Sequence, residues 1–316
     1  MSALIHIGLY KTASTFLQKN IFTNIQNRDY IQNVDPGLCK QIKHLARQEA
    51  INHMNTGMVD SKALIEIKKS VKEHNRDLII SSESFAGHPG LLFKDYRRIA
   101  LTLKKIFPEG KILLVIREQS SYLESLYKHA VKKGSTMSID DFLNIKQNRD
   151  FINTNIQNFN FKLKSPTDYR CLNYLPMVRT YYDLFGRDNV LCIPYELLNN
   201  SPDEFIEKIA NFSSSVIDNN IDNKIVNKGV SRFGFFSNFL VNRLNILLAR
   251  SNVVFKQMKI PIVLLIRFFV LIFDFIYFIP ARPLSKSSKN IINIYYRKKN
   301  LDLSALIDFD LKKCGY

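Results

Sequence analysis

The turn from Gly8 to Thr15 brings one lysine and several hydroxyl groups together. It has the sequence GLYKTAST and stands between an apolar run, residues 2–7, and a helical pattern, residues 15–25. Backbone N–H groups at a helix start, a lysine ammonium and hydroxyls together form a site for an anion. The spacing differs from that of a nucleotide-triphosphatase loop, which needs Gly-Lys-Ser/Thr. The alternative interpretation is an ordinary strand-to-helix turn that is capped by Ser and Thr side chains.

A second group that could bind an anion follows another apolar run. Arg117 comes directly after KILLVI, residues 111–116, and Ser125 lies eight residues later. A guanidinium offers a phosphate two parallel hydrogen bonds, and a hydroxyl adds a third. The alternative for Arg117 is a surface ion pair with Glu118 or Glu124.

Proton-accepting side chains follow a third apolar run, DLIISS at residues 77–82. Glu83 is the next residue and His88 lies five residues further on. A carboxylate or imidazole at a strand end, facing a basic pocket, can accept a proton from a hydroxyl group. Glu83 is the preferred base and His88 the second choice. Alternatively, Glu83 pairs with a lysine or caps the next helix. His6, within the first apolar run, is expected to be a buried structural side chain.

The elements that must position these groups form an alternating pattern. Short apolar runs are separated by helical patterns, which predicts an α/β fold with a parallel sheet between two layers of helices. In such sheets ligands bind at the carboxyl ends of the strands, so the three turns should converge on one site. The expected strands are residues 2–7, 77–82, 111–116 and 189–193.

The first turn resembles the 5′-phosphosulfate loop of the sulfotransferase family, whose pattern is Lys, a small or hydroxyl residue, Gly and two hydroxyl residues. The matching residues are Lys11, Thr12, Ala13, Ser14 and Thr15. Alanine replaces the usual glycine, which predicts a slightly tighter loop. Arg117 and Ser125 resemble the pair with which the family holds a 3′-phosphate.

This resemblance covers residues 2–212 and implies a P-loop-like sulfotransferase fold. It also implies the donor 3′-phosphoadenosine 5′-phosphosulfate and chemistry without a metal. The segment Tyr195-Glu196-Leu197-Leu198 matches a family turn whose role is structural. Lys228-Gly229 partly matches the element that closes over the adenosine, with Asn227 in place of a basic residue. In glycan-modifying members of the family a Glu follows the second strand in chain order, which here is the run at residues 77–82. Glu83 therefore favours a sugar or glycolipid acceptor.

Basic residues outnumber acidic ones by 45 to 28, and the excess is uneven. Residues 221–300 hold 14 basic residues and two acidic ones, and they surround an apolar run at 260–280. Basic residues beside an apolar helix favour a helix lying on an anionic membrane surface. Packing on the core or on a second subunit, and a spanning helix, are the alternatives. The predicted domains are a sulfotransferase domain, 1–230, and a basic, apolar helical region, 231–316.

The cysteines and the N-terminus indicate a cellular compartment, and two other functions are alternatives. Four widely spaced cysteines favour a reducing compartment. Without a secretory leader at the N-terminus, the prediction is a cytoplasmic protein, or one peripheral at the inner face of the membrane. A P-loop small-molecule kinase is one alternative, and a non-catalytic binder of anionic lipid through residues 221–300 is another. Nucleic acid is not an expected partner, and the oligomeric state stays open.

Overall fold

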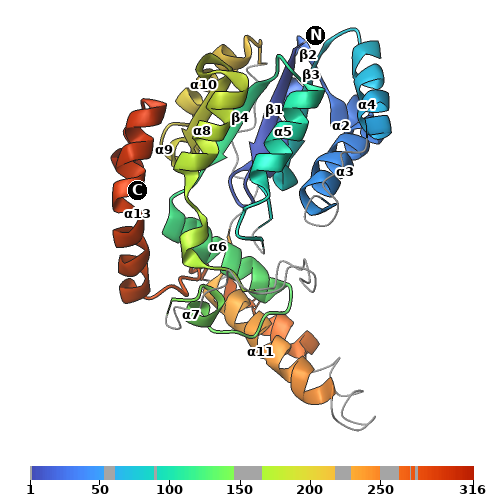
Figure 1. Ribbon diagram of the computed structural model, residues 1–316. Helices are drawn as coiled ribbons and strands as arrows, with labels where there is room; N and C mark the ends of the chain where they lie inside the picture. The colour runs from blue at the N-terminus through green and yellow to red at the C-terminus, as the bar shows by residue number, and fades with distance from the viewer. Residues whose placement is uncertain are drawn as a thin grey trace. The chain divides into compact units, whose positions relative to one another are not determined.

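The computed structural model describes residues 2–52, 61–88, 91–145, 166–217, 229–249, 263–270, 272–274 and 277–316 (Figure 1). The chain forms two compact units. The first comprises Met1–Gln119, Arg170–Val226 and Asn293–Tyr316, and the second comprises Ser120–Tyr169 and Asn227–Ile292. The domain limits predicted from the sequence, 1–230 and 231–316, stay a prediction.

A five-stranded parallel sheet forms the centre of the first unit, with the strand order β2-β3-β1-β4-β5 (Figure 1). The predicted α/β fold with a parallel central sheet is therefore confirmed. The four predicted strands are present within one or two residues of their expected ends, and β2 is an additional edge strand. The strands are β1 Ala3–Gly8, β2 Arg28–Tyr30, β3 Asp77–Ser82, β4 Lys111–Ile116 and β5 Val190–Pro194.

The register of the strands places three strand ends at the same edge of the sheet. Ile7 of β1 lies opposite Ser82 of β3 and opposite Leu114 of β4, and Gly8 lies opposite Val115. The turns that follow β1, β3 and β4 therefore start side by side. The strand order also reverses at β1, because β2 and β3 lie on one side of it and β4 and β5 on the other. Such a reversal is where parallel α/β sheets bind ligands.

Helices cover both faces of the sheet because its strands are apolar on both faces. One face packs against the helical stretch after the first turn and against α9 and α10, with Leu4, Leu113 and Phe205 fully buried. The opposite layer contains α3, α5 and α8. The elements of these layers are α1 Ser14–Phe16, η1 Leu17–Ile21, η2 Phe22–Asn24, α9 Tyr195–Asn200, α10 Pro202–Ser213, α3 Pro36–Asn52, α5 Tyr96–Ile106 and α8 Tyr174–Phe185.

Further helices are α2 Ile31–Val34, α4 Ser61–Glu73, α6 Gln119–Lys132, α7 Ile139–Phe142, α11 Arg232–Ala249 and α13 Lys286–Ile307. Helix α13 begins in the second unit and ends in the first. There it is fixed by Asn300, whose side-chain amide exchanges two hydrogen bonds with that of Gln119, and by the Tyr296 hydroxyl, which accepts the N–H of Leu172.

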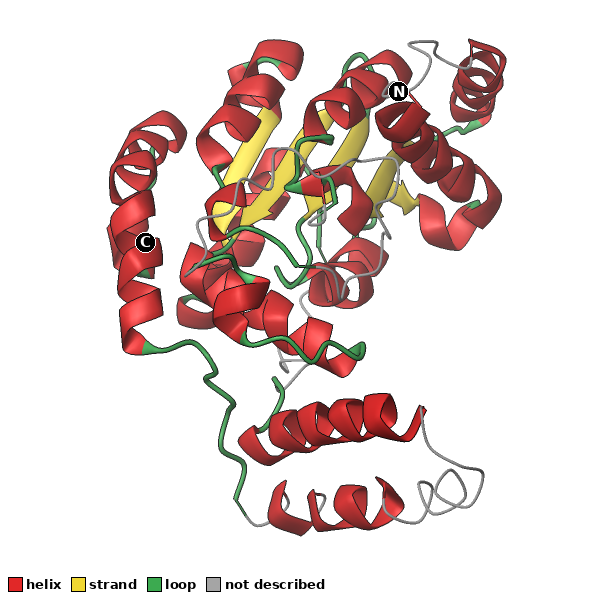
Figure 2. Cartoon of the chain, turned by 60° about the horizontal axis from the view of Figure 1, so that its bottom comes forward, coloured by secondary structure: helices red, strands yellow, loops and turns green. Residues whose placement is uncertain are grey.

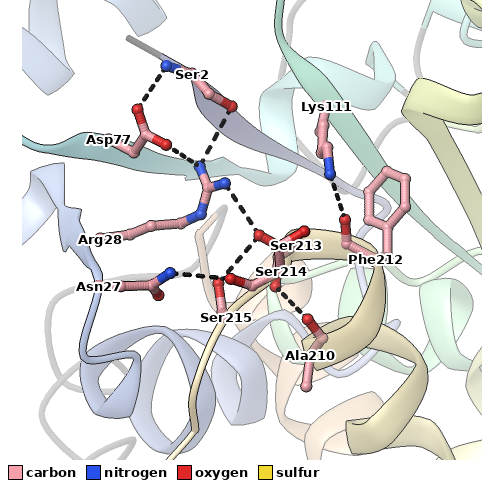
Figure 3. Close-up of polar contacts among 10 residues, drawn as sticks. All are labelled: Ser2, Asn27, Arg28, Asp77, Lys111, Ala210, Phe212, Ser213, Ser214 and Ser215. Carbon is pink, nitrogen blue, oxygen red and sulfur yellow. Dashed lines mark hydrogen bonds and ion pairs between the residues drawn. The ribbon is translucent and has the colours of Figure 1, made fainter.

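A polar network closes the edge of the sheet that lies opposite the three turns (Figure 3). Arg28 pairs with Asp77 at 3.6 Å and donates a 3.0 Å hydrogen bond to the Ser213 carbonyl oxygen, while Lys111 donates one of 2.8 Å to that of Phe212. These carbonyls end α10, so the two cations bind the negative end of a helix. The network fixes α10 to the first residues of three strands and leaves the other edge for the turns.

Candidate active site

The first turn has the backbone shape of an anion cradle. Lys11 and Ala13 have φ angles of 67° and 60°, and Ser14 after them starts a right-handed helix. A left-handed residue followed by a right-handed one turns successive N–H groups into a concave site for negative charge. Thr12 is buried and its hydroxyl donates 2.7 Å to the Leu9 carbonyl oxygen, which holds the turn closed. The Lys11 side chain is exposed.

Gly8 makes room for this turn to approach β3. A Cβ atom at this position would lie 2.9 Å from the Ser14 Oγ, 3.1 Å from His6 Cε1 and 3.5 Å from the Glu83 Cα. Any side chain at residue 8 would therefore separate the Ser14 hydroxyl from Glu83, the first residue of the turn after β3. The glycine is required by close packing, and its place at the end of β1 is what brings Ser14 and Glu83 together.

Glu83 begins the short helix η3 Glu83–Ala86 directly after β3. Burial raises the pKa of Glu83, while the positive charge of Lys11 and a hydrogen bond from Ser14 oppose the rise. The helix cap at this position is Ser82, whose hydroxyl accepts the Ser84 N–H. The predicted base is thus half-buried and lies beside the predicted anion-binding lysine.

His88, the second candidate base, is buried at the end of the same turn. Its backbone N–H is bound by both carboxylate oxygens of Asp95, at 3.0 and 3.1 Å. Gly87 before it has φ +91°, and a Cβ there would come within 2.5 Å of the Asp95 carboxylate. The backbone of His88 is therefore fixed, and its role as a base stays a prediction.

Arg117 is anchored to the first turn. Its Nη1 donates a 2.8 Å hydrogen bond to the Lys11 carbonyl oxygen, and its guanidinium lies 4.8 Å from the centre of the Tyr195 ring. The Arg117 carbonyl accepts the Tyr174 hydroxyl at 2.8 Å, and the next N–H, of Glu118, donates to Glu196 Oε1 at 3.0 Å. The guanidinium at the end of β4 is thus positioned by two neighbouring elements, α8 and α9.

Two further side chains lie close to each other behind this arrangement, those of Glu196 and Tyr316. Burial raises the pKa of Glu196, and the hydrogen bond from the Glu118 N–H and the positive charge of Arg117 oppose the rise. The buried Tyr316 hydroxyl in turn has its pKa raised by burial and by the Glu196 charge. The Tyr-Glu-x-Leu motif indicated a structural role at Glu196, but no pattern in the sequence indicated Tyr316.

Sequence reasoning also missed Tyr10. Burial raises its pKa, and the charges of Glu83 and Asp95 raise it further, while Arg47 opposes them. The phenol therefore lies in the electrostatic field of both carboxylates that follow β3. Tyr10 directly precedes Lys11 in the turn, so its position could have pointed to the site. The sequence alone, however, does not distinguish an aromatic residue of a site from one that only packs in the core.

The other predicted residues have different outcomes. Ser125 is half-buried on α6, in the second unit, and its contact with a donor stays a prediction. Lys228 lies outside the described residues. His6 is buried, as predicted, with Nδ1 2.8 Å from the Ser81 hydroxyl, and burial lowers its pKa to about 3. In the described part of the chain, no three His, Cys, Asp or Glu residues group as metal ligands would.

Fold and site together define an α/β protein with a backbone N–H cradle, a lysine and an arginine at the reversal point of a parallel sheet. A family model described as a sulfotransferase domain matches residues 2–235. The chain therefore belongs to the sulfotransferase family. No curated protein matches the chain in sequence.

Solved structures to which the chain is similar include three sulfotransferases. A sulfotransferase from Alicyclobacillus acidocaldarius has 18% identity and a TM-score of 0.49, over 81% of this chain and 99% of that chain. A sulfotransferase domain from the curacin biosynthetic pathway has 15% identity and a TM-score of 0.36, over 69% and 75%. A sulfotransferase domain from the Synechococcus PCC 7002 olefin synthase has 15% identity and a TM-score of 0.31, over 69% and 74%.

Proposed function

We propose that this sulfotransferase moves a sulfuryl group from 3′-phosphoadenosine 5′-phosphosulfate to a hydroxyl group of a carbohydrate or glycolipid. One observation carries the donor assignment: the Arg117 side chain is hydrogen-bonded to the backbone of the first turn, at Lys11. This bond couples an arginine that can hold one phosphate to an N–H cradle that can hold another. A nucleotide with phosphate groups on both sides of one ribose needs two such sites at a fixed separation.

The residues of the first unit fit this donor. The cradle at Ala13 and Ser14, with the exposed Lys11 ammonium, would hold the 5′-phosphosulfate end. Arg117 would hold the 3′-phosphate by paired hydrogen bonds. The family resemblance adds Gly8, Thr12 and Thr15 of the first unit to the proposed donor site. It also implies Ser125, which belongs to the second unit, and Lys228, which lies outside the described residues.

The donor supplies the sulfuryl group, and the protein supplies a proton acceptor and positive charge. Glu83 accepts the proton of the acceptor hydroxyl while the new oxygen–sulfur bond forms and the donor's sulfur–oxygen bond breaks. Lys11 and the N–H groups of the cradle stabilise the negative charge that develops on the departing phosphate oxygen. Partial burial makes Glu83 a stronger base than an exposed carboxylate, and the nearby Lys11 charge favours its ionised form.

The acceptor class depends on the residue type at the end of β3. A carboxylate at position 83, rather than a histidine, supports a sugar hydroxyl on a polysaccharide or glycolipid. We also place the enzyme in the cytoplasm, or at the inner face of the membrane. All four cysteines are free thiols, which supports a reducing compartment.

Thermal unfolding with two nucleotides tests the donor. Adenosine 3′,5′-bisphosphate should raise the Tm of the wild type, and ATP with magnesium should raise it less. The increase should be lost in Arg117→Ala. A larger increase with ATP and magnesium would favour the small-molecule kinase instead. Sulfation assays with the donor and a panel of polysaccharides, glycolipids and simple phenols then test the acceptor, and turnover of phenols alone would contradict a carbohydrate or glycolipid.

A further inference from the structure

The second unit contains a pair of helical stretches that we call the apolar hairpin: α11 together with the helical residues 263–270 and 272–274. Figure 2 shows the two stretches side by side at the bottom of the view. The rings of Phe233 and Phe273 stack with their centres 5.1 Å apart, so the stretches are in contact. A pocket between them is lined by apolar side chains of both, including Phe236 and Phe269.

The base of the hairpin is closed by a short antiparallel clasp. The Arg232 N–H donates to the Ile279 carbonyl at 2.6 Å, and the Ala281 N–H donates to that of Val230 at 3.0 Å. Beside it, the Ser231 hydroxyl donates to Asp274 Oδ2 at 2.6 Å. The two segments of this clasp hold the start and the end of the hairpin together.

The hairpin exposes an unusual amount of apolar side chain. In the described chain 21 large hydrophobic residues are exposed, and 11 of them lie on the hairpin. Phe236, Leu247 and Leu264 are each exposed by 60% or more, and Leu265 and Phe268 by 57% and 59%. So many exposed apolar side chains on one pair of helical stretches mark an interaction site rather than ordinary surface variation.

The charges around this surface are almost all positive. Residues 229–292 contain nine basic residues and a single acidic one, Asp274. That carboxylate is half-buried and bound by Ser231 at the clasp. Arg232, Arg243 and Arg267, by contrast, are exposed on the hairpin itself. The outward-facing charge that accompanies the apolar side chains is therefore cationic.

We infer that the apolar hairpin docks on the surface of an anionic phospholipid membrane and lies within the interface. Long basic side chains can reach headgroup phosphates while neighbouring apolar side chains enter the acyl boundary. Each basic residue near such a surface adds attraction. In a dimer through this face, the arginines of two copies would repel each other, so charge favours lipid over a second copy. In the described part of the chain, no helix combines the length and hydropathy needed to span a bilayer.

This inference goes beyond sulfotransfer, and vesicle flotation of the full-length protein tests it. The protein should float with vesicles of phosphatidylcholine and phosphatidylglycerol, and at least tenfold less with phosphatidylcholine alone. The variant Leu264→Ser/Leu265→Ser/Phe268→Ser should float about tenfold less or below. A matched control, Ile65→Ser/Leu101→Ser/Ile294→Ser, changes three apolar residues that are exposed elsewhere and should float as the wild type does.

Three results would overturn the inference. They are equal flotation of the two triple variants, equal flotation with both lipid compositions, and a wild-type dimer in light scattering that the hairpin variant alone abolishes. The last result would identify a second copy as the occupant. Binding of adenosine 3′,5′-bisphosphate by each variant shows that the first unit is folded. A wild type that floats but binds no bisphosphate would contradict the proposed function and leave the membrane inference standing.

Discussion

Arg117 and Lys11 are joined through a backbone atom, since Nη1 of the arginine donates a 2.8 Å hydrogen bond to the lysine carbonyl oxygen. The bond links the turns that follow β1 and β4, the two neighbouring strands at which the strand order reverses. It uses one edge of the guanidinium and leaves the Lys11 side chain exposed. A single hydrogen bond thus fixes the spacing between the Arg117 guanidinium and the backbone of the first turn, the two groups proposed to hold the phosphates of the donor.

Replacing the guanidinium by an ammonium should remove this spacing while keeping the charge. We expect Arg117→Lys to weaken binding of adenosine 3′,5′-bisphosphate by about 10- to 100-fold, because a lysine cannot bind the carbonyl and a phosphate with one rigid fork. Isothermal titration calorimetry measures the change. The control Arg97→Lys alters an exposed arginine on α5 and should bind as the wild type does. Unchanged affinity in Arg117→Lys would contradict the role of Arg117.

The choice between the two candidate bases has a kinetic test. Glu83→Gln should reduce kcat by about 100-fold or more, because the amide cannot accept the proton. Its affinity for adenosine 3′,5′-bisphosphate should change by no more than about twofold, since the proposed role of Glu83 is toward the acceptor and not toward the donor. The control Glu109→Gln alters an exposed carboxylate between α5 and β4. If His88→Asn produces the large loss of turnover and Glu83→Gln does not, His88 is the base.

The pH dependence of turnover should report Glu83 and its lysine neighbour. Only the ionised carboxylate accepts a proton, so kcat should rise with pH through a pKa above the ordinary 4.5, in the direction that burial dictates. Lys11 opposes that rise in pKa, so Lys11→Met should move the ascending limb of the kcat profile to higher pH. Lys69→Met, at an exposed position of α4, should leave the limb in place. A shift to lower pH in Lys11→Met would have the wrong sign.

Ala13 adopts a conformation that suits glycine. Its φ of 60° places a Cβ in the left-handed region, which costs about 1–2 kcal/mol, while glycine adds about 0.5–1 kcal/mol of unfolded-state entropy. We therefore expect Ala13→Gly to raise the free energy of unfolding by up to about 1 kcal/mol. The same change at Ala63, inside α4, should lower it by about 1 kcal/mol. Urea denaturation compares the two, and a destabilised Ala13→Gly would show that the turn is not strained.

The central strands of the sheet could be predicted because burial on both faces leaves a continuous apolar run in the sequence of each strand. Apolar runs such as 111–116 are buried on both faces, and only a central parallel strand requires that. The edge strand β2 could not be predicted, because its residues Arg28, Asp29 and Tyr30 show no apolar run and pair only along one side. Its arginine is buried through an ion pair with Asp77 and hydrogen bonds to α10, partners that lie far away in the sequence.

The same distinction applies to the site. The residues that follow strands, Glu83 and Arg117 among them, could be placed together because parallel strands end at a common edge. The supporting contacts of Arg117 could not be predicted, because the carbonyl of Lys11 and the hydroxyl of Tyr174 come close to it only after folding. Burial beside Glu83 likewise gives Tyr10 its electrostatic setting. A sequence pattern identifies residues by their place in the chain, and these residues act by their place in space.

The clasp between residues 230–232 and 279–281 makes the apolar hairpin a separable insertion. Its entry and exit are hydrogen-bonded to each other. A change in the length or composition of the intervening helices therefore does not alter where the chain leaves and rejoins the rest of its unit. Evolution could therefore replace this segment as a unit. The surface on which the enzyme docks would change, while the sheet and its turns keep their sequence.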